Sequence, residues 1–179
     1  MISWTAIKKS LQNWVRDEGR TVGGENDEAW SAIWEEQSEA RPERPYASLK
    51  IISGPLRKGS DQTSPGAVGT FITSGPREFT LSINAYGPES LERISKLMSE
   101  IEKMSMVAYF KAAGVACIKS GDVRDLTRLT GTRSESRHQF DVRFRTVDNI
   151  TEAPGIIESV EVTNNILEAA ARTDIIGTP

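Results

Sequence analysis

The chain has 179 residues, of which 37% are hydrophobic and 26% are charged, proportions typical of a soluble globular protein long enough to bury a core. No apolar run approaches the roughly 20 residues that a membrane-spanning helix needs, and the single cysteine, Cys117, excludes an internal disulfide. The net charge of −3 argues against a general nucleic-acid binder, which needs a basic patch.

An amphipathic helix is predicted near the N-terminus. Its apolar residues recur at spacings of three and four along one face: Trp4, Ile7, Leu11, Trp14 and Val15. Ser3 is a candidate N-cap, and Gly19 is a candidate C-terminal cap. We therefore expect a helix over residues 3–16 whose apolar stripe packs against a sheet.

The other two tryptophans follow a polar loop. Residues 29–37 are predicted to form a short strand, although the spacing of Trp30, Ile33 and Trp34 also suits a helix. All four tryptophans of the chain thus precede residue 35. We expect them to form one core cluster against the sheet. The alternative, an aromatic binding surface, would leave a large apolar patch exposed.

Residues 41–45 (RPERP) are expected to form a stiff connector, because each proline biases the preceding residue toward extended geometry. A strand is predicted at residues 46–53, followed by a long hairpin loop at residues 54–69 that has few apolar side chains. Loops of this length in compact domains are usually functional or disordered. Arg57 and Lys58 in this loop are therefore candidates for contact with an acidic partner.

The stretch 77–101 joins a strand to a helix, and the rest of the predicted fold is built around it. Every second residue of its first part is apolar: Phe79, Leu81, Ile83 and Ala85. This alternation predicts a strand with one buried face. Pro88 stops the strand and suits the first turn of a helix. The helix predicted at residues 89–103 carries an apolar stripe at Leu91, Ile94, Leu97, Met98 and Ile101.

The remaining elements are mainly strands. We expect a strand at 68–73, a short helix at 106–113, strands at 115–119, 123–129 and 138–147, a loop at 130–135, a turn at 149–155, a strand at 156–163 and a helical stub at 166–172. Together these elements predict an α+β fold with a single mainly antiparallel sheet, two principal helices packed on one face and a long hairpin loop. Residues 1–163 would form one domain, and residues 164–179 a C-terminal helical stub and tail.

The residues suited to chemistry are few. His138 is the only histidine and Cys117 the only cysteine, so neither a His-based metal cluster nor a pair of thiolate ligands is available. A Cys–His nucleophilic pair is the one alternative, but a lone strand histidine and a lone apolar cysteine are far more often structural. We therefore assign no catalytic, cofactor-binding or metal-binding residues and predict that the chain is not an enzyme.

The longest predicted strand has a charged outward face. Phe140, Val142 and Phe144 point one way, and the opposite face carries Gln139, Asp141, Arg143 and Arg145. One interpretation is a solvated strand face. The other is a subunit contact in which alternating charges set the register between neighbouring copies. Asp141, Arg143 and Arg145 therefore join Arg57 and Lys58 as candidate partner or subunit contacts.

Four segments resemble the tail terminator, or neck (head–tail joining), proteins of tailed bacteriophages. They are residues 30–37 (WSAIWEEQ), residues 41–46 (RPERPY), the strand at 79–86 before a Ser/Leu-rich helix, and residues 136–147 (SRHQFDVRFRTV). The resemblance spans roughly residues 1 to 163.

The resemblance implies a structural virion protein. Such a protein caps the tail tube and joins it to the head connector, typically as a hexameric ring. Its partners would be further copies of itself, the tail-tube protein and the head connector. It would be assembled in the host cytoplasm and located at the neck of the virion. No membrane and no sequence-specific nucleic acid is implied, although the genome can pass through the ring.

Two other functions remain open from the sequence. A monomeric protein-binding module would use the 54–69 loop as its contact. A small hydrolase would need a pocket built around His138 or Cys117.

Overall fold

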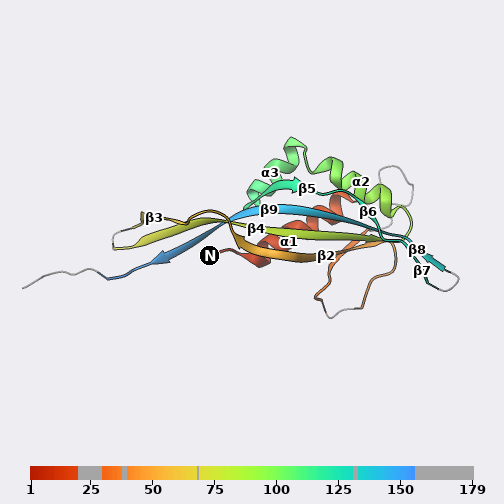
Figure 1. Cartoon of the computed structure of the whole chain (residues 1–179), viewed down its shortest axis with the longest axis horizontal. Helices are drawn as coiled ribbons and strands as arrows, with labels where there is room; N and C mark the ends of the chain where they lie inside the picture. Colours follow the sequence, from red (N-terminus) through yellow and green to blue (C-terminus); the bar gives the residue numbers. More distant parts are fainter. Residues whose placement is uncertain (20–29, 38–39, 68, 131–132, 156–179) are drawn as a thin grey trace, which may run out of the picture.

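The computed structural model describes residues 1–19, 30–37, 40–67, 69–130 and 133–155. These residues form three helices, a mixed seven-stranded sheet and a separate two-stranded hairpin, so the chain is α+β. The long strands run along the length of the molecule, and the helices lie over only part of the sheet (Figure 1). The strand expected at 156–163 and the C-terminal tail at 164–179 lie outside the described residues.

The sheet has the strand order β1–β2–β4–β9–β5. These strands are β1 (Ser31–Trp34), β2 (Tyr46–Arg57), β4 (Phe71–Tyr86), β9 (Arg137–Glu152) and β5 (Val115–Ser120). Two further strands extend it: β3 (Gln62–Pro65) pairs with β4, and β6 (Arg124–Asp125) pairs with β9. β1 and β2 are parallel, and the other pairs of this sheet are antiparallel. A separate hairpin joins β7 (Arg128–Thr130) to β8 (Arg133–Glu135).

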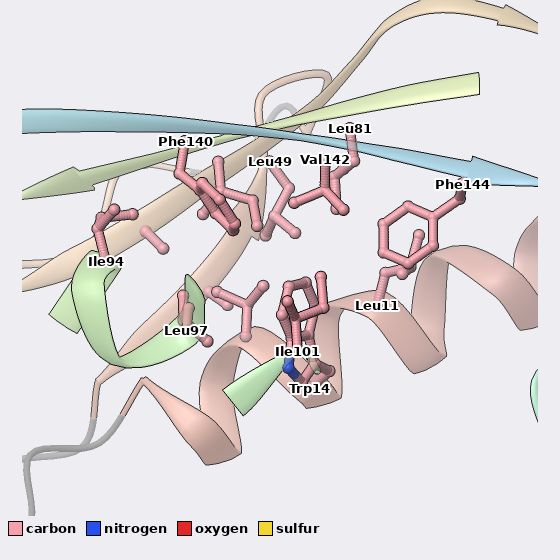
Figure 2. Packing of buried hydrophobic residues seen from close by; sticks show 14 of the residues in the cluster. Leu11, Trp14, Leu49, Leu81, Ile94, Leu97, Ile101, Phe140, Val142 and Phe144 are labelled. Carbon is pink, nitrogen blue, oxygen red and sulfur yellow. The ribbon is translucent and has the colours of Figure 1, made fainter. Parts of the chain in front are cut away.

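The core lies between the sheet and the helices α1 (Trp4–Glu18), α2 (Ser90–Glu100) and α3 (Met104–Ala112). Figure 2 shows Phe140, Val142 and Phe144 of β9 in one cluster with residues from α1 and α2. The predicted inward face of this strand is therefore confirmed. All four tryptophans also belong to this cluster or pack against it, as the core interpretation required.

Helix α1 has the expected apolar stripe but not the expected caps. Ile7, Leu11 and Trp14 are buried. Ser3 makes no side-chain capping hydrogen bond. Gly19 follows the last turn with φ −74°, so its position does not require the left-handed conformation that favours glycine.

The predicted stripe of α2 is wrong at two positions. Leu91 and Met98 are 46% and 37% exposed, whereas Arg93 is buried. Arg93 Nη1 donates a hydrogen bond to the Gly19 carbonyl (3.2 Å), and the guanidinium lies 4.8 Å from the centroid of the Trp30 ring. These contacts join α2 to the end of α1, and they place an arginine where the pattern suggested leucine.

The largest correction concerns residues 54–69, which do not form a long loop. β2 continues to Arg57, and β3 occupies Gln62–Pro65. β4 runs without interruption from Phe71 to Tyr86, and β9 continues to Glu152 instead of turning at 149–155. β3, residues 71–75 of β4 and residues 147–152 of β9 therefore form a three-stranded extension, here called the arm, which projects beyond the helices (Figure 1).

Two smaller expectations are also wrong in detail. The segment predicted as one strand at 123–129 contains the short strands β6 and β7, which belong to different sheets. The loop expected at 130–135 includes β8, which pairs back onto β7. This hairpin shows no hydrophobic alternation of the kind that indicates a strand with one buried face, and its Leu129 side chain is 79% exposed.

Candidate interaction surfaces

The sheet face opposite the helices, here called the open face, carries polar and charged side chains. On β9 the side chains at even positions from 138 to 146 are buried, and those at odd positions from 137 to 145 alternate with them. Antiparallel pairing places these odd positions beside the even positions 78 to 86 of β4. Each outward-facing side chain of β9 on the open face therefore lies directly beside an outward-facing side chain of β4.

Three of the five predicted contact residues gather around one carboxylate on this face. Arg145 donates two hydrogen bonds to Glu78 Oε1, from Nη2 (2.6 Å) and Nε (3.2 Å). Lys58 Nζ lies 4.0 Å from Glu78 Oε2. Hydrogen bonding from Arg145, followed by the charges of Arg145, Lys58 and Arg143, lowers the pKa of Glu78, although burial opposes this shift. The carboxylate is therefore held ionised among three cations.

Glu78 itself was not singled out from the sequence. It occupies an even position of β4, the same alternation that places Thr80 and Ser82 on the open face. That alternation was therefore enough to predict that the Glu78 side chain lies on the open face. Its partner was not visible, because the register that places Glu78 opposite Arg145 joins residues 67 positions apart.

The other two predicted residues lie elsewhere. Asp141 accepts a hydrogen bond from Gln139 Nε2 (2.9 Å) and lies 4.0 Å from Arg124 Nη1. Arg57 pairs in register with Arg77, not with the Glu78 row, and its Nε lies 3.5 Å from Asp61 Oδ1. The five residues thus belong to three separate charge clusters.

The arm is braced by an ion pair at its base. Arg77 donates hydrogen bonds from Nη1 and Nη2 to the two carboxylate oxygens of Asp61 (2.7 and 2.9 Å). Asp148 lies 3.9 Å from the same guanidinium. Gly75 makes room for this pair, because a Cβ at that position would lie 1.7 Å from Asp61 Oδ1. The turn between β2 and β3 is therefore held against β4.

The arm presents apolar side chains and an open strand edge. Phe71, Val147 and Ile150 are 44%, 54% and 47% exposed. β5 pairs with β9 only between Val142 and Thr146, so among the described residues no strand lies beside 147–152 on that side. The N-terminal amine of Met1 contacts this stretch at one point, where it donates a hydrogen bond to the Asn149 carbonyl. Unpaired edges with apolar side chains are places where another chain can add to a sheet.

A polar hollow of about 490 Å³ opens on the open face near β1 and β2. Two tyrosines line it, Tyr46 and Tyr86, whose rings stack with centroids 4.8 Å apart. Arg137 also lines it, lies 5.2 Å from the centroid of the Tyr86 ring, and donates hydrogen bonds to Asn84 Oδ1 from Nη2 (2.9 Å) and Nε (3.2 Å). This end of the face is thus ordered by side-chain contacts.

The residues considered for catalysis do not come together. Cys117 pairs with Phe144, six residues along β9 from His138, a separation of roughly 20 Å. Burial raises the pKa of the Cys117 thiol, which opposes formation of the reactive thiolate. In the described part of the chain, no group of three or more His, Cys, Asp and Glu side chains is placed to hold a metal ion, and no helix is both long and apolar enough to cross a membrane.

One triad-like arrangement was missed by the sequence reasoning. His138 Nδ1 lies 2.8 Å from Ser90 Oγ, and His138 Nε2 lies 3.8 Å from Asp125 Oδ1. Ser90 is only 1% exposed, and its hydroxyl also contacts Ser136 Oγ at 2.7 Å. A substrate therefore cannot reach this hydroxyl, and the contacts fix the start of α2 against β9.

A braced arm with an open edge and a charged sheet face define a protein suited to contacts with other macromolecules. Comparison with known families agrees with this class. Residues 5–169 match the family described as phage neck terminator protein, and the chain belongs to this family of structural virion proteins. The resemblance drawn from the sequence is thereby confirmed. No curated protein matches the chain.

Proposed function

We propose that the protein closes the phage tail tube and joins it to the head connector as a ring-shaped oligomer, a hexamer as the resemblance implies. It is assembled in the host cytoplasm and acts at the neck of the virion, with residues 1–163 as one domain. Membership of the neck terminator family supports the structural role. The observation that carries the ring is the arm, an extension beyond the helices whose 147–152 edge pairs with no other strand among the described residues.

The arm supports a head-to-tail contact between copies. Phe71 and Ile150 lie diagonally across the β4–β9 pair, since Phe71 is opposite Glu152 and Thr73 is opposite Ile150. Both apolar side chains are about half exposed, so a neighbouring copy that covers them removes apolar surface from water. A contact between two different surfaces of the same chain closes into a ring when its rotation permits.

The charged residues supply contacts beyond the arm. Lys58, Arg143 and Arg145 surround Glu78 on the open face and are proposed as partner contacts. Arg57, the last residue of β2, is proposed as a partner contact at the base of the arm, where it faces Asp61. Asp141 is proposed as an acidic contact on the same face.

The native mass of the purified full-length chain tests the ring. The wild type is expected to sediment as a closed oligomer, and Phe71→Lys/Ile150→Lys as a monomer, because charge on the arm opposes strand addition. The matched control is Val107→Lys/Leu129→Lys, which charges two exposed apolar residues away from the arm. A monomeric wild type, or equal assembly of both variants, would contradict the ring.

A monomeric wild type would instead favour the alternative function, a protein-binding module that uses the 54–69 segment. In the structure this segment contains the end of β2, the turn that follows it and β3. A module of this kind would therefore present the edge of a strand rather than a loop.

The tail-closing role is tested in the phage. A deletion of the gene is expected to give filled heads without tails, together with unjoined tails of irregular length, because nothing would end the tube or join it to the head. Electron microscopy of lysates measures both products. Normal joined particles from the deletion phage would exclude the role, whatever the native mass of the protein.

A further inference from the structure

The open face is basic although the protein as a whole is acidic. Along its strands, β2 contributes Lys50, with Lys58 directly after the end of β2, β9 contributes Arg137, Arg143 and Arg145, and β5 and β6 add Lys119 and Arg124. Three anionic side chains lie on the same face: Glu35, Glu78 and Asp141. Seven cations against three anions leave an excess of four. The whole chain has 22 cationic and 25 anionic residues, so the rest of the chain carries 15 cationic and 22 anionic residues and is acidic.

The three anions do not neutralise the middle of this face. Each of them already lies within 4.0 Å of a cation: Glu35 of Lys50, Glu78 of Lys58 and Arg145, and Asp141 of Arg124. Arg143 and Lys119 are exposed, and neither forms an ion pair within 4.0 Å in the described part of the chain, although the charge of Arg143 acts at longer range on Glu78.

Arg143 and Lys119 are also direct cross-strand partners on β9 and β5. Like charges opposite each other destabilise a sheet, so folding alone does not favour this pair. Arg145 lies two positions along β9 on the same side. A polyanion placed over these three cations would relieve the repulsion between them.

We propose that the open face binds the phosphate backbone of duplex DNA without reading its sequence. Between the cations, β4 and β9 present hydroxyl and amide side chains, Thr80, Ser82, Asn84 and Gln139, which are the groups that contact phosphate and sugar beside Arg and Lys. An acidic protein partner is the other class considered, but the centres of stable protein interfaces are apolar and depleted of charge.

The geometry also explains why binding is independent of base sequence. Base edges in the major groove are reached by an inserted helix or a two-stranded ribbon, whereas here the cations lie on one face of a sheet and the helices pack on its other face. The inference goes beyond the proposed function, since a single subunit carries the whole face.

The test is fluorescence anisotropy of a labelled duplex of about 30 base pairs with the purified full-length protein, between about 20 and 200 mM salt. Wild-type affinity is expected to fall steeply with salt. Lys119→Glu/Arg143→Glu is expected to weaken binding at least about tenfold at low salt and to reduce the salt slope by about two. The Gln pair, Lys119→Gln/Arg143→Gln, should weaken it in the same direction.

The matched control is Lys9→Glu/Lys111→Glu, which changes the net charge equally at exposed sites on α1 and α3. It is expected to weaken binding less than about threefold. Thermal melts followed by circular dichroism confirm that each variant is folded.

Three results would overturn the proposal. The first is that the wild type does not bind DNA at low salt. The second is that Lys119→Glu/Arg143→Glu and the control Lys9→Glu/Lys111→Glu weaken binding equally. The third is that polyglutamate of matched charge competes for the protein as well as unlabelled DNA does. The last result would assign the face to an acidic protein partner. Native mass measured on the same samples separates this failure from failure of the ring.

Discussion

Phe144 contacts aromatic rings from three different elements. Its ring stacks on Phe79 of β4 (centroids 5.7 Å apart) and meets Trp14 of α1 and Phe110 of α3 edge to face, at 6.3 and 5.2 Å. The side chain is fully buried. One residue of β9 thereby joins the sheet to two helices, and the alternation with Phe140 and Val142 was sufficient to predict its inward orientation.

Replacing Phe144 by Ala is expected to lower the free energy of unfolding by about 3–5 kcal/mol, since transfer energy is lost and a cavity remains. The control is Phe71→Ala on the arm, where the side chain is 44% exposed and a loss below about 1 kcal/mol is expected for the isolated subunit. Urea unfolding followed by tryptophan fluorescence measures both. Equal losses at the two sites would mean that the core is not organised around β9.

At the scale of elements, the sequence predicted the helices and strands that have one buried face. It missed the short strands that are held in place only by hydrogen bonds to a neighbouring strand. The helices and the strands β1, β2, β4, β5 and β9 were found because their periodicity is local. In the arm, the strand predicted at 68–73 overlaps β4, but β3 (QTSP) was missed because it is polar and exposed throughout and its position depends on its pairing with β4. Arg93 was missed for a similar reason: Trp30 and the Gly19 carbonyl, which it contacts, lie far away in the sequence.

The bracing of the arm gives it a defined dependence on pH. Hydrogen bonding from Arg77 lowers the pKa of Asp61 in the folded protein. A lowered folded pKa contributes stability that is fully present above the unfolded value of about 4, and that is lost as pH falls through the folded value. We therefore expect the arm to loosen below about pH 4.

The loosening of the arm is measured by hydrogen exchange of the backbone amides in 62–64 and 71–75 between neutral pH and about pH 3, after correction for intrinsic exchange. Protection of these amides should fall with pH in the wild type, and should be low at every pH in Asp61→Asn. Ser74→Ala, on the same strand but outside the ion pair, should behave as the wild type. Parallel profiles for wild type and Asp61→Asn would show that the ion pair does not brace the arm.

At the scale of the whole molecule, part of the candidate surface was predictable. Alternation along β9 identified Asp141, Arg143 and Arg145. The basic character of the open face was not predictable, because a net charge of −3 averages it with an acidic remainder, and because Lys119 joins Arg143 only through the β5–β9 register. Charge distribution is a property of the folded sheet, whereas net charge is a property of the composition.

The proposed ring predicts how defective subunits act when they are mixed with intact ones. If every junction requires the arm of one copy, a single Phe71→Lys/Ile150→Lys subunit leaves a ring open. Co-expression of equal amounts of variant and wild type should then leave closed rings at about one half to the sixth power, or about 2%, for six subunits. A dimer would retain about one quarter.

Native mass spectrometry across several mixing ratios measures the exponent, and Val107→Lys/Leu129→Lys in place of the arm variant should leave the closed fraction unchanged. A closed fraction that stays unchanged as the variant fraction rises would mean that variant subunits are incorporated normally, and the arm would then not be the junction that closes the ring.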